Sequence, residues 1–176
     1  MDIAKLLNDK SLKPKQKTEL LGLKLISKEL SIQDLLAFAE TAKGSAKATC
    51  VEALESATRQ DTSIANEKCL AFACNALTDK APRVKWESAK VIGNIAGMFP
   101  GKLAPAVKNL LINTESDGTV VRWAAAFALG EILKLNTRLN KELLPTVEAI
   151  CNRENNNGVK KKYLDALKKI KKSSAK

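Results

Sequence analysis

Two segments of the chain repeat each other closely, and this repeat constrains the fold more than any other feature. Residues 84–95 read VKWESAKVIGNI and residues 121–132 read VRWAAAFALGEI, at an offset of 37 residues. Valine, a basic residue, tryptophan, alanine, glycine and isoleucine recur at matching places. Weaker copies of the same apolar frame begin at Ala46 and Val159, each 38 residues away from its neighbour. A self-similar period of this length predicts stacked supersecondary units instead of a single closed core.

Each unit contains two helical patterns separated by a polar break. Only 4% of the residues are aromatic, and no segment alternates like a strand and then turns like a hairpin. Ser31 with Asp34 is typical of a capping box, and Pro82 suits the first turn of a helix. We therefore expect an all-α protein, a short right-handed superhelix of four to five helix pairs. The expected pairs are 2–8 with 14–28, 31–42 with 45–58, 62–78 with 82–98, 102–113 with 118–134, and 140–152 with 157–172.

The chain is expected to form one repeat domain over residues 1–176. That length is sufficient to bury a core without disulfides or a structural metal. The terminal units should be atypical, because each must cover an open apolar face. The expected organisation is a capping pair at 1–28, repeats at 31–58, 62–98, 102–134 and 140–172, and a basic tail at 173–176.

The third of these repeats resembles a HEAT repeat. Its second helix carries the pattern D-x-x-x-V-R-x-x-A-A-x-A-L-G-x-I from Asp117 to Ile132, and the L-x-P-x-x-x-x-L-L from Leu103 to Leu111 is similar to a HEAT first helix. The unit beginning at Val84 repeats the pattern with lysine in place of arginine. The outer units keep only the apolar frame and the base, so the resemblance covers about 30–172.

The resemblance implies a mode of action as well as a fold. HEAT-like proteins are mostly scaffolds whose second helices line a concave protein-binding surface, and a branch resembling alkylpurine DNA glycosylases binds DNA in the same groove. The resemblance also implies that Asp117 and Arg122 belong to a structural ladder between repeats. In the preceding repeat, Lys80 stands where the equivalent of Asp117 is expected, and Asp79 is one residue away. Fold alone does not choose between the two ligand classes.

Helical spacing predicts which side chains face the groove. Val121, Ala125, Ala128, Leu129 and Ile132 form the expected buried stripe. Positions two, three, six and ten after Ala46, Val84, Val121 and Val159, which begin the repeated frame, should then point away from the core. These positions are Ala48, Thr49, Glu52 and Ser56; Trp86, Glu87, Lys90 and Asn94; Trp123, Ala124, Phe127 and Glu131; and Lys161, Lys162, Asp165 and Lys169.

Six of these residues are the candidate partner-binding residues: Trp86, Lys90, Trp123, Phe127, Lys161 and Lys162. Aromatic side chains anchor protein partners, and lysines steer acidic ones. The alternative for both tryptophans is that their rings complete the packing between repeats. Gly93 and Gly130 lie in mid-helix, where glycine is unfavourable, and we expect them to permit close approach of neighbouring units.

The positive charge is concentrated at one end. Of the net +11, residues 159–176 contribute +7 through eight lysines and Asp165, so the remainder is nearly balanced at +4. A basic end favours binding to an acidic protein, a nucleic acid or an anionic membrane. The alternative is that the lysines only keep the protein in solution. The membrane is the least favoured partner, because the apolar stripe Val159, Tyr163, Leu167 and Ile170 is also the stripe that should pack between helices.

Other classes of function are disfavoured by composition. The chain has no histidine, which excludes imidazole catalysis and histidine-containing zinc sites, and its four cysteines form no CxxC pair. We expect no metal, no cofactor and no enzymatic activity, although Trp123 with Glu131 or Trp86 with Glu87 could be cast as a base-excision site. Four scattered cysteines and the absence of a signal-like N-terminus favour a cytoplasmic protein.

Two hypotheses for the function therefore remain. The first is a non-catalytic scaffold that binds a protein partner, acidic in character, through its concave face. The alternative is a DNA- or RNA-binding protein that uses the same groove and the basic C-terminal helix, with binding that weakens steeply as salt rises. The oligomeric state is left open.

Overall fold

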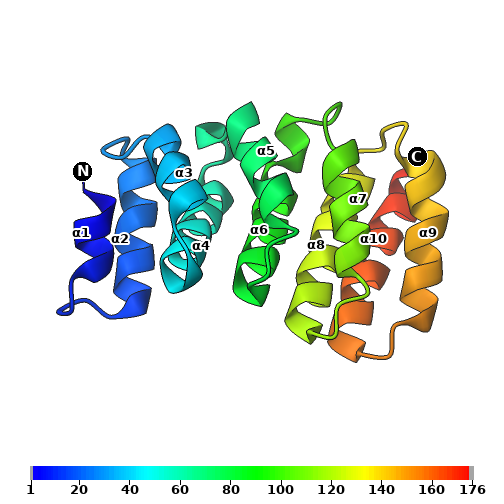
Figure 1. The fold of residues 1–176 in the computed structure, drawn as a ribbon. Coiled ribbons are helices and arrows are strands. Elements are labelled where there is room, and N and C mark those ends of the chain that lie inside the picture. The colour runs from blue at the N-terminus through cyan, green and yellow to red at the C-terminus, as the bar shows by residue number, and fades with distance from the viewer. Residues whose placement is uncertain (1, 175–176) are drawn as a thin grey trace.

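The computed structural model describes residues 2–174 as a row of packed helices, with the two chain ends at opposite ends of the row (Figure 1). Residues 175 and 176 of the expected basic tail lie outside the described residues, and 173 and 174 continue the last helix. The helices are α1 (Ile3–Asn8), α2 (Pro14–Ile26), α3 (Ile32–Thr41), α4 (Gly44–Gln60), α5 (Glu67–Ala76), α6 (Pro82–Ile95), α7 (Ala104–Asn113), α8 (Thr119–Lys134), α9 (Asn140–Arg153) and α10 (Asn157–Ser174). The described part contains no strand, and the expected all-α superhelix of helix pairs is confirmed.

The local signals that predicted the helices act as expected at two positions. The Ser31 hydroxyl accepts a hydrogen bond from the Asp34 amide at 3.1 Å and donates to the Asp34 carboxylate at 2.7 Å, so it caps α3. Pro82 is the first residue of α6, where the missing N–H has no helical partner to lose.

Three predicted boundaries are wrong, each for a local reason. The pattern at 62–78 is a short 3-10 turn, Thr62–Ile64, followed by α5, because the Asn66 side chain accepts from the Cys69 amide at 3.0 Å and starts a new helix. The helix expected to reach 98 ends at Ile95 and continues as a 3-10 turn, Ala96–Met98. The helix expected to reach 28 ends at Ile26, since Lys28 has a positive φ of 62°.

The even-numbered helices form a continuous layer. α2, α4, α6, α8 and α10 pack side by side in chain order, and α3, α5, α7 and α9 cover one side of this layer (Figure 1). We call the exposed side of α4, α6, α8 and α10 the second-helix face. The predicted buried stripe of α8 is confirmed, because all five of its side chains are at most 2% exposed. Buried apolar side chains form one cluster that runs from Ile3 to Leu167.

Candidate partner-binding surface

The second-helix face consists of fewer positions than helical spacing predicts. Position three after the first apolar residue is not on the face in three helices: Thr49 is 6%, Glu87 5% and Ala124 0% exposed. Ala48, at position two of α4, is also buried. These four expectations were wrong because each second helix is flanked by two others, which cover its sides as well as its core stripe. Positions six and ten remain on the face in all four helices, together with Trp86, Trp123, Lys161 and Lys162.

Two glycines set how closely the layer packs, as expected. A β-carbon at Gly93 of α6 would lie 2.5 Å from Cε1 of Phe127 on α8, and one at Gly130 of α8 would lie 2.9 Å from Cβ of Ala166 on α10. Real β-carbons do not come so near to other heavy atoms, so no larger residue fits without movement. The glycines therefore place the Phe127 ring against the backbone of α6 and hold α10 close to α8.

Three of the six candidate residues form one cluster between α8 and α10, which we call the aromatic–lysine cluster. The Trp123 and Phe127 rings are stacked, with centroids 6.1 Å apart and planes inclined by 14°. The ammonium of Lys162 lies over the Trp123 ring, 4.6 Å from its centroid. Offset stacking and a cation above an indole are both attractive contacts. All three side chains are half-buried, so each keeps surface for a ligand.

An open depression of about 150 Å³ adjoins this cluster. Phe127, Lys162 and Asp165 contribute to its walls. Glu131 also lies there and is ion-paired with Lys134 one turn further along α8. The depression thus joins an aromatic ring to exposed side chains of both charges, with lysines from α10 along one side.

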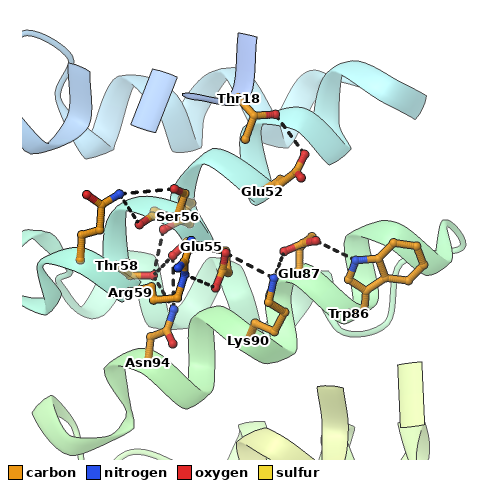
Figure 2. Close-up of polar contacts among 12 residues, drawn as sticks. Thr18, Glu52, Glu55, Ser56, Thr58, Arg59, Trp86, Glu87, Lys90 and Asn94 are labelled. Carbon is orange, nitrogen blue, oxygen red and sulfur yellow. Dashed lines mark hydrogen bonds and ion pairs between the residues drawn. The ribbon is translucent and has the colours of Figure 1, made fainter. Parts of the chain in front are cut away.

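The other aromatic candidate, Trp86, belongs to a separate polar network on α4 and α6 (Figure 2). Its indole N–H donates to Oε1 of Glu87 at 2.7 Å. The Lys90 ammonium bonds Oε2 of Glu87 at 2.9 Å and lies 3.3 Å from Oε2 of Glu55. Lys90 is therefore a bridge between two carboxylates whose side chains are only 7% and 5% exposed.

This network makes the α4–α6 half of the face electrically neutral. Arg59 adds a second cation on Glu55 at 3.2 Å, so two carboxylates face two cations. Buried charges need such partners, since an unpaired one is strongly destabilising. Asn94 completes the contact by donating to the Glu55 carbonyl and the Thr58 hydroxyl, each at 3.3 Å. The structure thus places Trp86 and Lys90 together, but apart from the aromatic–lysine cluster.

Lys161 is exposed on α10, at the repeat position that Trp123 occupies on α8. It joins neither the cluster nor the network. The seven lysines and one aspartate of α10 give this helix a charge of +6. Among the described residues, Lys161 and Lys162 have no carboxylate within ion-pair distance, unlike Lys90. The face therefore has positive charge without a carboxylate partner at Lys161 and Lys162.

The ladder between repeats is present with different partners from those expected. Lys47 of α4 pairs with Asp79 in the next repeat at 2.7 Å, and Arg122 of α8 pairs with Glu154 in the next repeat at 3.0 Å. Arg122 also donates to the carbonyls of Ser116 and Asp117, whereas the Asp117 carboxylate is exposed to solvent. Asp79, and not Lys80, is thus the repeat equivalent of Asp117 and Glu154. Counting back 38 residues from Asp117 leads to Asp79, whereas counting back 37 leads to Lys80.

Both ladder carboxylates are ionised more readily than usual. Burial raises the pKa of Glu154, but hydrogen bonds from Arg122 and two backbone amides, together with the Arg122 charge, lower it further, so the net shift is downward. The pKa of Asp79 is lowered in the same way by Lys47 and the Ala81 amide, against the opposing effect of burial. Both carboxylates therefore serve as the anionic partners of ion pairs that join neighbouring repeats.

Sequence reasoning missed Glu55, and it expected Glu87 to be exposed on the face when its side chain is buried. Glu55 occupies the repeat position that Gly93 and Gly130 hold, nine residues after the first apolar residue of its helix. That register was a usable signal, because a carboxylate at a position facing the next repeat must be paired there. Both residues serve the packing of α4 on α6.

Little in the described residues suggests covalent or metal chemistry. Within residues 2–174 no group of three histidine, cysteine, aspartate or glutamate side chains lies close enough together to hold a metal ion. Burial raises the pKa of the Cys50 and Cys69 thiols to about 12, and that of Cys74 to about 11. Within the same residues, every helix is too short or too polar to traverse a bilayer.

Solved structures of helical-repeat proteins are similar to this chain. One is the complex of CpcE and CpcF of phycocyanin lyase from Nostoc sp. PCC7120, with 20% identity over 94% of this chain and 97% of the matched chain, at a TM-score of 0.73. A designed armadillo repeat protein in complex with the peptide (KR)4 is 19% identical over 96% of this chain and 80% of its own, with a TM-score of 0.73. A second designed armadillo protein matches at 18% identity over 96% and 80%, with a TM-score of 0.71.

No protein-family model matches the chain, and no curated protein matches it significantly. At these identities the solved structures establish the fold, which is a solenoid of HEAT-like helical repeats.

Proposed function

From this HEAT-like solenoid, we propose that the chain is a non-catalytic scaffold whose second-helix face, the concave side of the stack, binds a protein partner. The observation that carries the proposal is the aromatic–lysine cluster of Trp123, Phe127 and Lys162 beside an open depression. Half-buried aromatic rings held rigidly by their neighbours are the usual anchors of protein interfaces. The continuous core supports treating residues 1–176 as one repeat domain with this function.

The partner segment is proposed to be acidic. The charges of Glu55, Glu87, Lys90 and Arg59 cancel on the α4–α6 half of the face, while α10 carries +6. A field of this kind attracts and orients an anionic partner. Trp123, Phe127, Lys161 and Lys162 are then the contact residues. Trp86 and Lys90 lie in the electrically neutral α4–α6 half of the same face.

The similar structures support a polypeptide ligand. One of them is a two-protein complex and another holds a peptide. The peptide in that case is (KR)4, which is basic, so the charge proposed for the partner here rests on the lysines of this chain alone.

A non-catalytic role is supported by the state of the carboxylates. Glu87 is engaged by Trp86 and Lys90, and Glu131 by Lys134, so neither is poised as a general base. Because one similar structure is a lyase complex, the proposal rests on these contacts and not on the fold. A cytoplasmic location is proposed as well, since four cysteines buried as free thiols suit a reducing compartment.

Nucleic-acid binding is the second candidate, and one observation favours it. A stacked pair of aromatic rings under a lysine is also a platform on which bases stack. Nucleic-acid binding predicts an association constant whose logarithm falls linearly with the logarithm of the salt concentration. We rank it second because the cluster is a single site and the lysines lie at one end of the face, not along its length.

The proposal is tested by comparing what four forms of the protein retain from extracts of the source organism treated with nuclease. The forms are the wild type, Trp123→Ala/Phe127→Ala, Lys162→Glu, and the control Ile112→Ser on the exposed outer side of α7. We expect wild type and control to retain the same polypeptides, and both cluster variants to lose them. Thermal melts confirm that each variant is folded. Identical retention by all four forms contradicts the proposal, and so does a wild type that retains polypeptides from untreated extract but none from the nuclease-treated extract.

A further inference from the structure

The C-terminal end of the stack carries a second surface, separate from the second-helix face. A groove of about 380 Å³ runs between α9 and α10 at this end. Its apolar part comes from Leu164, Leu167 and Cys151, and its polar part includes Lys168, Lys171 and Glu148. Leu164 is 41% exposed, which makes it one of few large apolar side chains on the described surface to be open to solvent.

Inside the stack, the matching surface of a second helix is covered by the next repeat. On α8 this surface consists of Ala126, Gly130 and Leu133, all buried where α10 packs beside α8. The repeat offset of 38 places Leu164, Lys168 and Lys171 at the same positions on α10. At the position where Gly130 lets Ala166 approach α8, α10 carries Lys168. A further repeat in the same register would bury Lys168 and would have to supply carboxylates to it, as Arg59 and Lys90 supply cations to Glu55, which holds the equivalent position on α4.

A second copy of the chain is also a poor occupant. Back-to-back association at this end would bring the lysines of two α10 helices together. Head-to-tail association would bring α10 against the N-terminal pair, and residues 2–30 carry seven lysines and four acidic residues, a net +3. Like charges on facing surfaces oppose both arrangements.

We infer that the α9–α10 groove binds an amphipathic acidic helix of a partner protein. Apolar side chains spaced three and four residues apart on such a helix cover Leu164 and the small exposed edge of Leu167, and flanking glutamates or aspartates pair with Lys168 and Lys171. Helix-in-groove recognition has this pattern of anchors. The stretch of α10 from 161 to 171 is about 15 Å long at ~1.5 Å per residue, which suits a partner helix of about three turns.

This inference is independent of the proposed function, because the groove shares no residue with the aromatic–lysine cluster. It also differs from membrane binding by α10. Val159 and Tyr163 are fully buried and Leu167 is 9% exposed, so the apolar stripe of the helix lies in the core. Only the apolar floor of the groove is available to a ligand.

The test uses a synthetic helical peptide of about 18 residues, with leucines at i, i+3, i+4 and i+7 and glutamates elsewhere, labelled for fluorescence anisotropy. Its control has the same composition in scrambled order. At near-physiological salt we expect the amphipathic peptide to bind at least tenfold more tightly than the scrambled one, and to gain helical circular dichroism on binding. Equal affinity of the two peptides, or no binding, overturns the inference.

Variants locate the site. Leu164→Ser and Lys168→Glu/Lys171→Glu each replace exposed or rim side chains, and we expect each to weaken binding tenfold or more. Lys68→Glu/Lys108→Glu changes the net charge equally on exposed parts of α5 and α7 and should bind like the wild type. Trp123→Ala/Phe127→Ala should also bind like the wild type, which separates this site from the proposed function. Loss of binding in either of these last two variants overturns the inference, as does equal binding to vesicles containing phosphatidylserine.

Discussion

The ring of Phe127 occupies the space that a side chain at Gly93 would need. A β-carbon on residue 93 would lie 2.5 Å from Cε1 and 2.9 Å from Cδ1 of that ring. The same ring stacks on Trp123, so the glycine in one helix positions an aromatic pair on the next. Packing between repeats and the shape of the candidate binding surface thus depend on the same contact.

Gly93→Ala is expected to destabilise the protein despite its better helix propensity. Alanine gains about 1 kcal/mol in a helix interior, but overpacking costs about 1–3 kcal/mol, and displacing Phe127 also weakens its stacking. We expect a net loss of about 1–2 kcal/mol, measured by urea unfolding.

Gly22→Ala is the matched control for this change. Gly22 is also a buried mid-helix glycine, and its nearest neighbour to a new β-carbon would be at an ordinary 3.5 Å. It should be neutral or stabilising by up to about 1 kcal/mol. If Gly93→Ala changes the free energy of unfolding as Gly22→Ala does, the position of the Phe127 ring does not depend on Gly93.

Lys90→Met is expected to be strongly destabilising. It removes the cation that bridges Glu55 and Glu87, whose side chains are 5% and 7% exposed. Removing one partner of a buried ion pair costs about 3–5 kcal/mol, and Lys90 itself is partly exposed, so the lower end applies. Urea unfolding measures the loss.

The triple variant Lys90→Met/Glu55→Gln/Glu87→Gln should recover much of that stability, because no carboxylate is then left without a cation. If the triple variant is as unstable as Lys90→Met, lost packing of the lysine stem, and not charge, explains the effect.

Glu154 is expected to contribute stability that depends on pH. Its pKa is lowered in the folded protein, so the unfolded chain binds a proton more readily. The contribution is present above the ordinary value of 4.5 and is lost as pH falls through the folded value. We expect Glu154→Gln to cost about 1.5–3 kcal/mol at pH 7 and to lose less stability than the wild type on acidification. Glu142→Gln, at an exposed carboxylate, should leave both quantities unchanged. A wild-type acid profile in Glu154→Gln contradicts the role of the Arg122 pair.

The four cysteines are expected to be unreactive in the folded protein. Burial raises their thiol pKa values, to about 12 for Cys50 and Cys69, so little thiolate exists near pH 8. An aromatic disulfide reagent should titrate no thiol rapidly under native conditions and four in denaturant. Rapid modification of any thiol in the native protein would show that its helix opens easily.

The helix pairs could be predicted from the sequence because each helix buries one stripe against its own repeat, and that stripe recurs with the helical period. The Ser31 cap and the first-turn Pro82 were readable because each depends only on neighbouring residues. Contacts between repeats join residues more than 30 positions apart, as with Lys47 and Asp79. The period alone does not encode which flank of a helix a neighbour covers.

The candidate site was predictable only in part, for this reason. Trp123, Phe127 and Lys162 come from two repeats, and only the packing of α8 on α10 brings them together. Lys90 shows the converse case. Its place on the face was readable, as was Glu87 three residues earlier on the same helix, but Glu55 was not, because it lies on the preceding repeat.

The central claim is that the second-helix face binds a polypeptide, and in-cell photo-crosslinking tests it most directly. A photo-reactive phenylalanine analogue replaces Asp165, which is exposed beside Phe127 and Lys162, or Ile112, which is 60% exposed on the outer helix layer. We predict a discrete crosslinked protein from position 165, absent from position 112 and lost when Trp123→Ala/Phe127→Ala is added. A crosslink to nucleic acid at 165, or the same products from both positions, would contradict the account.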